Sequence, residues 1–355
     1  MYDIIIVGAG PAGAIAGKYL ARSGKRVLLL QKDLSFKKPC GGGIRMEAFD
    51  ELEIDKCVVK NLIEKITLET KKKSIEFDIS NTPLGIVDRV EFDQHLRNDA
   101  MNTGAEVIEA KVVDVKILSS KVLVEAQIGD ICKHYEAEYL IAADGVLSVV
   151  RKKVRKEEVP KQLIHYSDVD SLATSKCHFY LGTTLTGHGY GWRFPYEGGS
   201  DVGTIGKKGL YNLFRFLGID QKEKVRGYNI PTWEKPLFYE DRVFYVGDAA
   251  GQVLPFTYEG IYYAMQSAKI LSEVIIDDVD FSEYETRWNT RYLKKFTMLK
   301  KLERIFLFND LMILLLMKTL ERPKLKPKAI EIWMGKYEVK IDIYFFARMF
   351  KRAFL

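Results

Sequence analysis

An α/β fold that opens with a nucleotide-binding βαβ unit is the fold class predicted for this chain. Two observations support it. The first is that 47% of the 355 residues are apolar, enough to bury the cores of two or three structural units. The second is that residues 2–7 form an apolar strand that runs directly into a glycine-rich turn, followed by a helix-like segment. The sequence therefore predicts a Rossmann-like domain at the N-terminus, within a fold that is α+β overall.

The turn Gly8-Ala9-Gly10-Pro11-Ala12-Gly13 has the spacing of a dinucleotide-binding fingerprint. Gly8 is expected to permit the tight turn, Gly10 to let a pyrophosphate approach the backbone, and Gly13 to let the helix pack on the strand. Free N–H groups and the helix dipole at this end would favour the negative charge of the phosphates. We therefore expect Gly8, Gly10, Ala12 and Gly13 to form the cofactor site.

A second strand is predicted over residues 25–30, and the residue after it normally carries an acid that accepts hydrogen bonds from the adenosine ribose. Here that residue is Gln31. Its amide carbonyl can still accept a hydroxyl, so binding is expected to survive with lower strength. Asp33 is a less well placed substitute.

Two later stretches separate a flavoprotein from a nicotinamide enzyme, which the first fingerprint alone cannot do. A predicted strand ends in Asp144-Gly145, and another ends in Gly247-Asp248 before a turn and a helix. Together with the N-terminal turn they resemble the three-part signature of the FAD-dependent p-hydroxybenzoate hydroxylase superfamily. The resemblance implies that Asp248 bonds the ribitol or pyrophosphate region, and that the helix starting near Gly260 points its positive end at the flavin.

The same resemblance places Arg89, just before a predicted helix, near the flavin. The alternative for this residue is an ordinary surface arginine.

The stretch KKPCGGGI, residues 37–44, narrows the family further. A cysteine followed by glycines, combined with Pro255, Glu259-Gly260-Ile261 and the strand Tyr190-Gly191-Trp192-Arg193-Phe194-Pro195, resembles the geranylgeranyl reductase family over roughly residues 1–290. By that resemblance Gly41, Gly42 and Gly43 lie against the flavin, Cys40 lies near its reactive face, and Trp192 and Phe194 line the substrate cavity. Tyr258 stands where the family commonly has glycine, so it is expected to reshape this cavity. The C-terminal region also looks short for the family.

Saturating an isolated double bond requires a proton as well as a hydride, and the developing carbocation must be kept from water. Cys40, Tyr190 and a water molecule are three candidate proton donors, and the sequence does not choose among them.

The remaining chain suggests how the domains are divided. Alternating segments such as CHFYLGTTL and residues 190–206 predict a mainly antiparallel sheet over the flavin, whereas long periodic segments after residue 281 predict a C-terminal helical region broken by Pro323 and Pro327. We expect an FAD-binding domain from residues 1–60, 85–155 and 240–290, a substrate-binding sheet from 61–84 and 156–239, and helices over 291–355. Gly203-x-x-Gly206-x-x-Gly209 is expected to be a strand and turn, not a second nucleotide site.

Cysteines and charges limit the other possibilities. The four cysteines form no Cys-x-x-Cys pair and the five histidines are scattered, so no metal site is expected. The chain begins without the layout of a secretory leader, which favours a cytoplasmic protein.

All of the formal charge of +6 lies after residue 317, where ten Lys or Arg accompany four Asp or Glu and several aromatic residues. This tail suits either peripheral contact with the inner face of a membrane or a helical lobe with inward-facing aromatics.

The leading hypothesis is an FAD-dependent reductase of C=C bonds in a geranylgeranyl, isoprenoid lipid or polyprenyl chain, with NAD(P)H or a ferredoxin as electron donor and no nucleic acid partner. The alternatives are an FAD-dependent monooxygenase or halogenase of an aromatic or quinone substrate, and a membrane-associated flavoprotein that passes electrons to quinones. No Lys stands in the Lys-x-x-Trp element that halogenases use, which disfavours halogenation.

Overall fold

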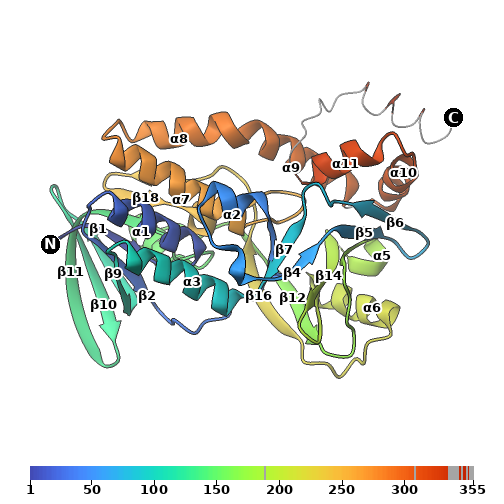
Figure 1. The fold of residues 1–355 in the computed structure, drawn as a ribbon, viewed down its shortest axis with the longest axis horizontal. Helices are drawn as coiled ribbons and strands as arrows, with labels where there is room; N and C mark the ends of the chain where they lie inside the picture. The colour runs from blue at the N-terminus through green and yellow to red at the C-terminus, as the bar shows by residue number, and fades with distance from the viewer. Residues whose placement is uncertain (188, 308, 335–343, 345–346, 349–350, 352–355) are drawn as a thin grey trace.

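An eight-stranded sheet forms one half of the molecule in the computed structural model, which describes residues 1–187, 189–307, 309–334, 344, 347–348 and 351 (Figure 1). Its path runs β17-β18-β11-β1-β2-β8, and β10 pairs with both β11 and β9. The four central pairs, from β18 to β8, are parallel, as a nucleotide-binding sheet requires. The strands are β1 Tyr2–Val7, β2 Val27–Gln31, β8 Glu106–Glu109, β9 Lys111–Ile117, β10 Val122–Ile128, β11 Ile131–Ala142, β17 Tyr239–Glu240 and β18 Val243–Tyr245.

Both faces of β1 are buried, which explains why its sequence is apolar without alternation. Ile4 and Ile6 belong to the larger core, beneath the helices α1 (Pro11–Arg22) and α7 (Ile261–Ile276), whereas Ile5 and Val7 belong to a second core with β9 and β10. The predicted first strand is confirmed. The second strand begins at Val27, two residues later than predicted, and includes Gln31.

A seven-stranded sheet forms the other half, in the order β16-β12-β15-β14-β13-β5-β6 (Figure 1). All of its neighbours are antiparallel except β13 and β5, so the prediction of a mainly antiparallel sheet is confirmed. Its strands are β5 Lys65–Glu69, β6 Ser74–Asp78, β12 Lys161–Val169, β13 Cys177–Leu181, β14 Tyr190–Tyr196, β15 Gly199–Ile205 and β16 Arg226–Pro231.

A small sheet of three antiparallel strands carries the end of the glycine loop. Its members are β3 (Gly43–Arg45), β7 (Leu84–Val87) and β4 (Val59–Ile63), with β7 in the middle. The helix α3 (Arg89–Asn102) follows β7 at once, and the Asp88 side chain caps it by accepting the backbone N–H groups of Val90 and Glu91. The loop is therefore held on one side by a hydrogen-bonded strand.

Helices dominate the chain after residue 260, as predicted (Figure 1). Pro327 does not break them: it lies in the first turn of α11, where a missing N–H group costs no hydrogen bond. Pro323 lies in the turn between α10 and α11. The remaining helical elements are α2 Glu47–Glu51, η1 Lys56–Val58, α4 Val149–Val154, α5 Thr183–Thr186, α6 Lys207–Leu217, η2 Gly247–Ala250, α8 Ser282–Trp288, the π-helix η3 Asn289–Leu293, α9 Lys294–Phe306, α10 Asp310–Leu320 and α11 Lys326–Trp333.

Two local predictions were wrong. The end of CHFYLGTTL forms the short helix α5 instead of continuing the strand, because Gly182 turns the chain with a φ of 131°. Gly209 lies inside α6, so the Gly203 to Gly209 segment is a strand, a turn and a helix. The proposed division into three domains stays a prediction. Within the part of the chain that the structure describes, no helix is long and apolar enough to cross a membrane.

Candidate functional site

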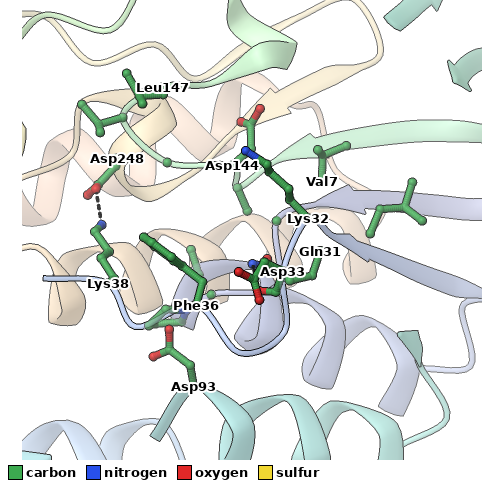
Figure 2. Close-up of a pocket in the computed structure, with 18 of the residues that line it drawn as sticks. Val7, Gln31, Lys32, Asp33, Phe36, Lys38, Asp93, Asp144, Leu147 and Asp248 are labelled. Atoms are coloured by element: carbon green, nitrogen blue, oxygen red, sulfur yellow. Dashed lines mark hydrogen bonds and ion pairs between the residues drawn. The ribbon is translucent and has the colours of Figure 1, made fainter. Parts of the chain in front are cut away.

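A cavity of about 470 Å³ opens along the carboxyl ends of the parallel strands, where nucleotides bind in sheets of this type (Figure 2). It brings together residues that lie far apart in the sequence, from Val7 to Ala264. Eight of the predicted cofactor residues line it: Gly8, Gly10, Ala12, Gln31, Arg89, Asp144, Gly145 and Asp248.

The three glycines of the N-terminal turn have distinct geometries that match their predicted roles. Gly8 has a φ of 95°, and a Cβ there would lie 2.4 Å from the Ala143 carbonyl oxygen. A Cβ on Gly13 would lie 1.8 Å from the Gly8 oxygen, so this residue permits close packing and does not line the cavity. Gly10 has no described atom within 4 Å of its Cβ position, which leaves open space above the helix start.

The N-terminus of α1 faces this space without a competing side chain. Gly10 is its N-cap, no side chain caps the first turn, and Pro11 has no N–H group to satisfy. The free N–H groups and the dipole of this twelve-residue helix favour an anion beside Ala12. The site therefore fits the pyrophosphate of a dinucleotide.

Gln31 lies at the edge of the cavity, but its carbonyl oxygen already has a partner. Its Oε1 accepts the backbone N–H of Ala9 at 2.7 Å, and its Nε2 donates to the Asp33 carbonyl at 2.9 Å. The side chain thus braces the glycine turn. Asp33 accepts hydrogen bonds from Ser35 and is exposed.

Asp144 supplies a buried polar atom that lacks a protein partner. Its Oδ2 accepts the backbone N–H of Val150 at 3.1 Å, whereas Oδ1 is buried without a hydrogen bond in the described structure. Burial raises the pKa of this carboxyl. An unsatisfied acceptor in the wall of a cavity is the atom that a ligand hydroxyl would satisfy.

A lysine that the sequence analysis did not assign to the site pairs with Asp248. Lys38 Nζ lies 2.5 Å from Asp248 Oδ2, across the cavity shown in Figure 2. Burial lowers the pKa of Lys38, but the adjacent carboxylate outweighs this effect and the net pKa is raised. Lys38 stands in the KKPCGGGI stretch, but the contact spans 210 residues and no local pattern reports it.

Arg89 is not a surface residue. It is the first residue of α3 and is 3% exposed, and its guanidinium binds Asp93 through two hydrogen bonds of 3.0 and 2.8 Å. The Asp93 carboxylate holds the pKa of Arg89 above its ordinary value despite burial. A buried Arg89–Asp93 ion pair therefore forms part of the cavity wall.

A second cavity of about 170 Å³ lies beside the first and has a different chemistry. Among the described residues that line it, Glu259 alone carries a formal charge. The wall is mainly aromatic and aliphatic and includes ten predicted site residues: Cys40, Gly41, Gly42, Gly43, Tyr190, Trp192, Phe194, Tyr258, Gly260 and Ile261. We call it the aromatic cavity.

One short segment contributes to both cavities. Lys38 lines the first, which we call the dinucleotide cavity, whereas Pro39 to Gly43 line the aromatic cavity. Neighbouring residues of a single loop thus face both sites.

Each glycine of the loop has a steric reason. A Cβ on Gly41 would lie 2.3 Å from the Phe194 ring, and one on Gly43 would lie 3.2 Å from the same ring. Gly42 has a φ of 70°, and its Cβ would meet the Val87 carbonyl oxygen at 2.4 Å. In this structure the glycines let the loop pack against Phe194 and β7. Their approach to a flavin ring stays a prediction.

The two candidate proton donors from the protein differ in their partners. Cys40 is exposed, and its Sγ accepts the backbone N–H of Gly42 at 3.4 Å, so its own proton is not held by that bond. The Tyr190 hydroxyl donates to the Thr257 carbonyl at 2.6 Å, and burial raises its pKa. Tyr190 is therefore the poorer donor in this arrangement.

Tyr258 adopts a backbone conformation that is unusual for a residue with a side chain. Its φ is 53°, its ring stacks on Tyr190 with centroids 5.8 Å apart, and its hydroxyl donates to Glu303 at 2.7 Å. Glu303 is 3% exposed on α9. The residue that departs from the family pattern thus ties the cavity wall to the C-terminal helices.

The orientation of the Trp192 indole is fixed by a hydrogen bond to a carboxyl group. Its indole N–H donates to Asp201 on the adjacent strand β15, two residues from its pairing partner Gly203. Burial raises the pKa of Asp201 to about 7. A single acid in a strand gives no distinctive pattern, so the sequence does not mark Asp201.

Strand β3 and the start of α7 are joined by a buried ion pair. The Arg45 guanidinium donates two hydrogen bonds to the Glu259 carboxylate, at 2.9 and 2.5 Å. It also donates to the Tyr263 hydroxyl at 3.0 Å. Gly260 is the N-cap of α7 and has no side-chain capping partner, so the helix N-terminus opens on the aromatic cavity. Gly247, by contrast, packs against Ala264 behind the first cavity and does not line it.

One group of possible metal ligands occurs among the described residues. Glu125, Cys132 and His134 have ligand atoms within 4.8 Å of one another on the β10–β11 hairpin, away from both cavities. The group is partly or fully exposed, and such groups are common without an ion. The expectation of no metal stays a prediction.

Comparisons with known proteins agree with this geometry. The FAD binding domain family matches residues 1–185. A geranylgeranyl diphosphate reductase from Rhodobacter capsulatus is 30% identical over 292 residues, covering 77% of this chain and 74% of the relative. A digeranylgeranylglycerophospholipid reductase from Methanosarcina mazei is 29% identical, covering 81% and 80%.

A solved structure shows the same fold. The geranylgeranyl bacteriochlorophyll reductase-like protein of Thermoplasma acidophilum superimposes with a TM-score of 0.79 at 21% identity, over 99% of this chain and 96% of that one. With the FAD-binding domain over residues 1–185 and a relative at 30% identity across most of both chains, the protein belongs to the geranylgeranyl reductase family of FAD-dependent oxidoreductases.

Proposed function

We propose that this protein is an FAD-dependent reductase that saturates C=C bonds of a geranylgeranyl or related isoprenoid chain. The observation that carries the proposal is the aromatic cavity, which shares the loop from Lys38 to Gly43 with the dinucleotide cavity: Lys38 lines the latter and Pro39 to Gly43 line the former. When bound and reduced, FAD supplies the hydride. Its phosphates fit the N-terminus of α1, with Arg89, Asp144 and the Lys38–Asp248 pair as further contacts.

The aromatic cavity suits an apolar acceptor that becomes positively charged during reduction. Ring faces attract a cation, and a wall with few polar groups excludes the water that would trap it. Phe179 contacts Tyr190 and Phe194 with ring centroids 5.6 and 5.3 Å apart, so the rings form one continuous surface. The single charged residue in the wall, Glu259, is neutralised by Arg45.

We further propose Cys40 as the proton donor. Its Sγ accepts the Gly42 N–H, a bond that does not use the thiol proton, and the residue lines the aromatic cavity. The Tyr190 proton is instead committed to the Thr257 carbonyl. A water molecule in the cavity is the remaining alternative.

The proposal is tested by reducing the FAD-loaded protein without oxygen and adding geranylgeranyl diphosphate. We expect the flavin to reoxidise and the lipid to gain two hydrogens for each bond reduced, as measured by mass spectrometry. If neither change occurs with any isoprenoid offered, the proposed function is wrong.

The monooxygenase and halogenase alternatives make a different prediction in the same assay. They require substrate-dependent oxygen uptake, which a reductase of C=C bonds does not. Among the described residues no lysine lines the aromatic cavity, which disfavours the handling of hypohalous acid there.

The electron donor and membrane contact are separate parts of the proposal. We propose that NAD(P)H or a ferredoxin reduces the flavin, and anaerobic bleaching of the bound flavin by each donor distinguishes them. We also propose a cytoplasmic protein that binds the inner face of a membrane through α10 and α11. Leu311 and Leu314 are 62% and 42% exposed on α10, and several lysines follow in the next residues.

A further inference from the structure

We propose that Trp333 sets the length of isoprenoid chain that the aromatic cavity accepts. The inference rests on the proposed function and specifies its substrate. Trp333 is the last residue of α11, and both it and Met334 line the cavity. No other helix after α7 contributes a described residue to this wall.

The indole of Trp333 packs against two rings of the cavity wall and one core ring behind it. Its centroid lies 4.9 Å from that of Phe179 and 6.3 Å from that of Tyr190 in the wall, and 5.0 Å from that of Phe256 in the core, all in edge-to-face orientations. Phe256 has a φ of 76°, so a strained backbone presents its ring to the indole. Trp333 thus fills space that would otherwise extend the cavity.

The remaining volume is small for the substrates of this family. Sites that enclose a drug-sized ligand have roughly 300–1,000 Å³. The aromatic cavity has about 170 Å³, so with Trp333 in place it encloses only part of a twenty-carbon chain. Trp333 borders this volume, so a longer chain that runs toward α11 meets the indole and must displace it.

The helix that carries Trp333 is less firmly held than the strands that form the floor of the cavity. The floor consists of residues in hydrogen-bonded strands, such as Ile164 on β12 and Ile205 on β15. Helix α11, by contrast, has no fully buried residue. Two polar contacts are described between this region and the seven-stranded sheet. Lys326 donates a hydrogen bond to the Glu76 carbonyl, and Glu321, just before the helix, forms an ion pair with Lys73. Displacing the indole therefore costs less than opening the sheet.

The test compares prenyl diphosphates of ten and twenty carbons on the wild type and on Trp333→Ala. Dissociation constants are measured by calorimetry on the oxidised, FAD-loaded protein, and kcat/KM is measured with reductant present. We expect Trp333→Ala to raise the preference for the longer chain about tenfold, the effect of a small change in an apolar pocket. Trp333→Phe should shift the preference less in the same direction. Ile332→Ala, on the same helix but outside the cavity wall, is the matched control.

The outcomes separate the two proposals. If the wild type binds neither diphosphate, the proposed function and this inference both fail. If both chains bind and Trp333→Ala changes the two dissociation constants equally, Trp333 is only structural and this inference alone is wrong. A normal flavin spectrum for each variant shows that the fold is retained, and Trp333→Phe decides the question if the alanine variant does not fold.

Discussion

Single side chains decide how the cofactor is held. Gln31 stands where an acid is usual, and its carbonyl oxygen is engaged by the Ala9 N–H instead of being free for a ribose. The Gln31 side chain therefore stabilises the glycine turn directly, and it contributes to ligand binding through the shape of that turn. The sequence showed that the acid was missing, but it did not reveal the bond to Ala9, because that contact depends on the shape of the turn.

Replacing Gln31 with Glu should tighten FAD binding. A carboxylate keeps an acceptor for the Ala9 N–H and adds a charged acceptor for a hydroxyl, worth about 2 kcal/mol. It loses the bond from Nε2 to the Asp33 carbonyl, worth about 1 kcal/mol, so we expect a roughly fivefold lower dissociation constant. Titration of the apoprotein with FAD, followed by quenching of flavin fluorescence, measures the change. Gln31→Leu, which removes both contacts, should weaken binding, and equal affinities for the two variants would contradict this role.

Replacing Cys40 with Ser should leave FAD bound but slow turnover by at least about tenfold, within the range for loss of a general acid. Tyr190→Phe is the comparison, because its hydroxyl is already bonded to the Thr257 carbonyl. We expect a smaller loss there. Single-turnover reoxidation of the reduced flavin measures both rates, and an unchanged rate in Cys40→Ser would assign the thiol to packing.

At the scale of helices and strands, one ion pair connects the end of the glycine loop to the start of α7. Arg45 lies on β3 at the end of the loop and Glu259 precedes α7, so their pairing fixes two cavity walls relative to each other. The two residues are 214 positions apart, and helix or strand periodicity cannot predict such a contact. Conversely, the strands and α7 themselves were predictable, because their apolar patterns are local.

Removing Glu259 should destabilise the protein, since it leaves the Arg45 charge buried without a partner. The expected loss for Glu259→Ala is about 3 kcal/mol in the free energy of unfolding. Urea unfolding of the FAD-loaded protein measures it. The double variant Arg45→Met with Glu259→Ala should recover part of the loss, and a purely additive result would mean that the pair is not coupled.

The burial of Asp201 should make the stability of the seven-stranded sheet depend on pH. Burial raises the pKa of Asp201 from 3.8 to about 7, so the folded chain holds a proton that the unfolded chain releases. This contribution is therefore present below about pH 4 and is lost as pH rises toward 7, at a rate of at most about 1.4 kcal/mol per pH unit.

Asp201→Asn removes the titrating group while keeping an oxygen for the Trp192 N–H. Urea unfolding at pH 5 and pH 8 should show the wild type losing more stability than the variant as pH rises. Parallel losses in the two proteins would show that another group is responsible.

At the scale of the whole molecule, three sheets are combined with a set of C-terminal helices (Figure 1). Residues from these elements line both cavities. The nucleotide-binding half was predictable because glycine spacing and strand ends mark it in the sequence. The part of the aromatic cavity wall that comes from the C-terminal region was not predictable. In the sequence Trp333 is only one aromatic residue in a basic tail, and Met334 gives no signal. Of the other tail aromatics, Tyr344 is exposed, and Phe345, Phe346, Phe350 and Phe354 lie outside the described residues.

Membrane contact through the C-terminal helices predicts binding to anionic vesicles. Lys324→Glu with Lys328→Glu should weaken it at least roughly thirtyfold, given about 1 kcal/mol for each basic residue near the surface. The control is Lys116→Glu with Lys133→Glu, which makes the same charge change on exposed residues of the β9–β11 strands at the opposite end of the molecule (Figure 1). Vesicle flotation measures both, and equal effects would indicate a nonspecific response to net charge.

The last residues to join the lining of the dinucleotide cavity, Val246, Asp248 and Ala264, come after two thirds of the chain. A nascent polypeptide on the ribosome therefore displays a complete glycine turn long before the carboxylate and the helix behind it have been translated. FAD can be captured in full only near the end of synthesis, so translation products that stop short of residue 248 should leave the ribosome colourless.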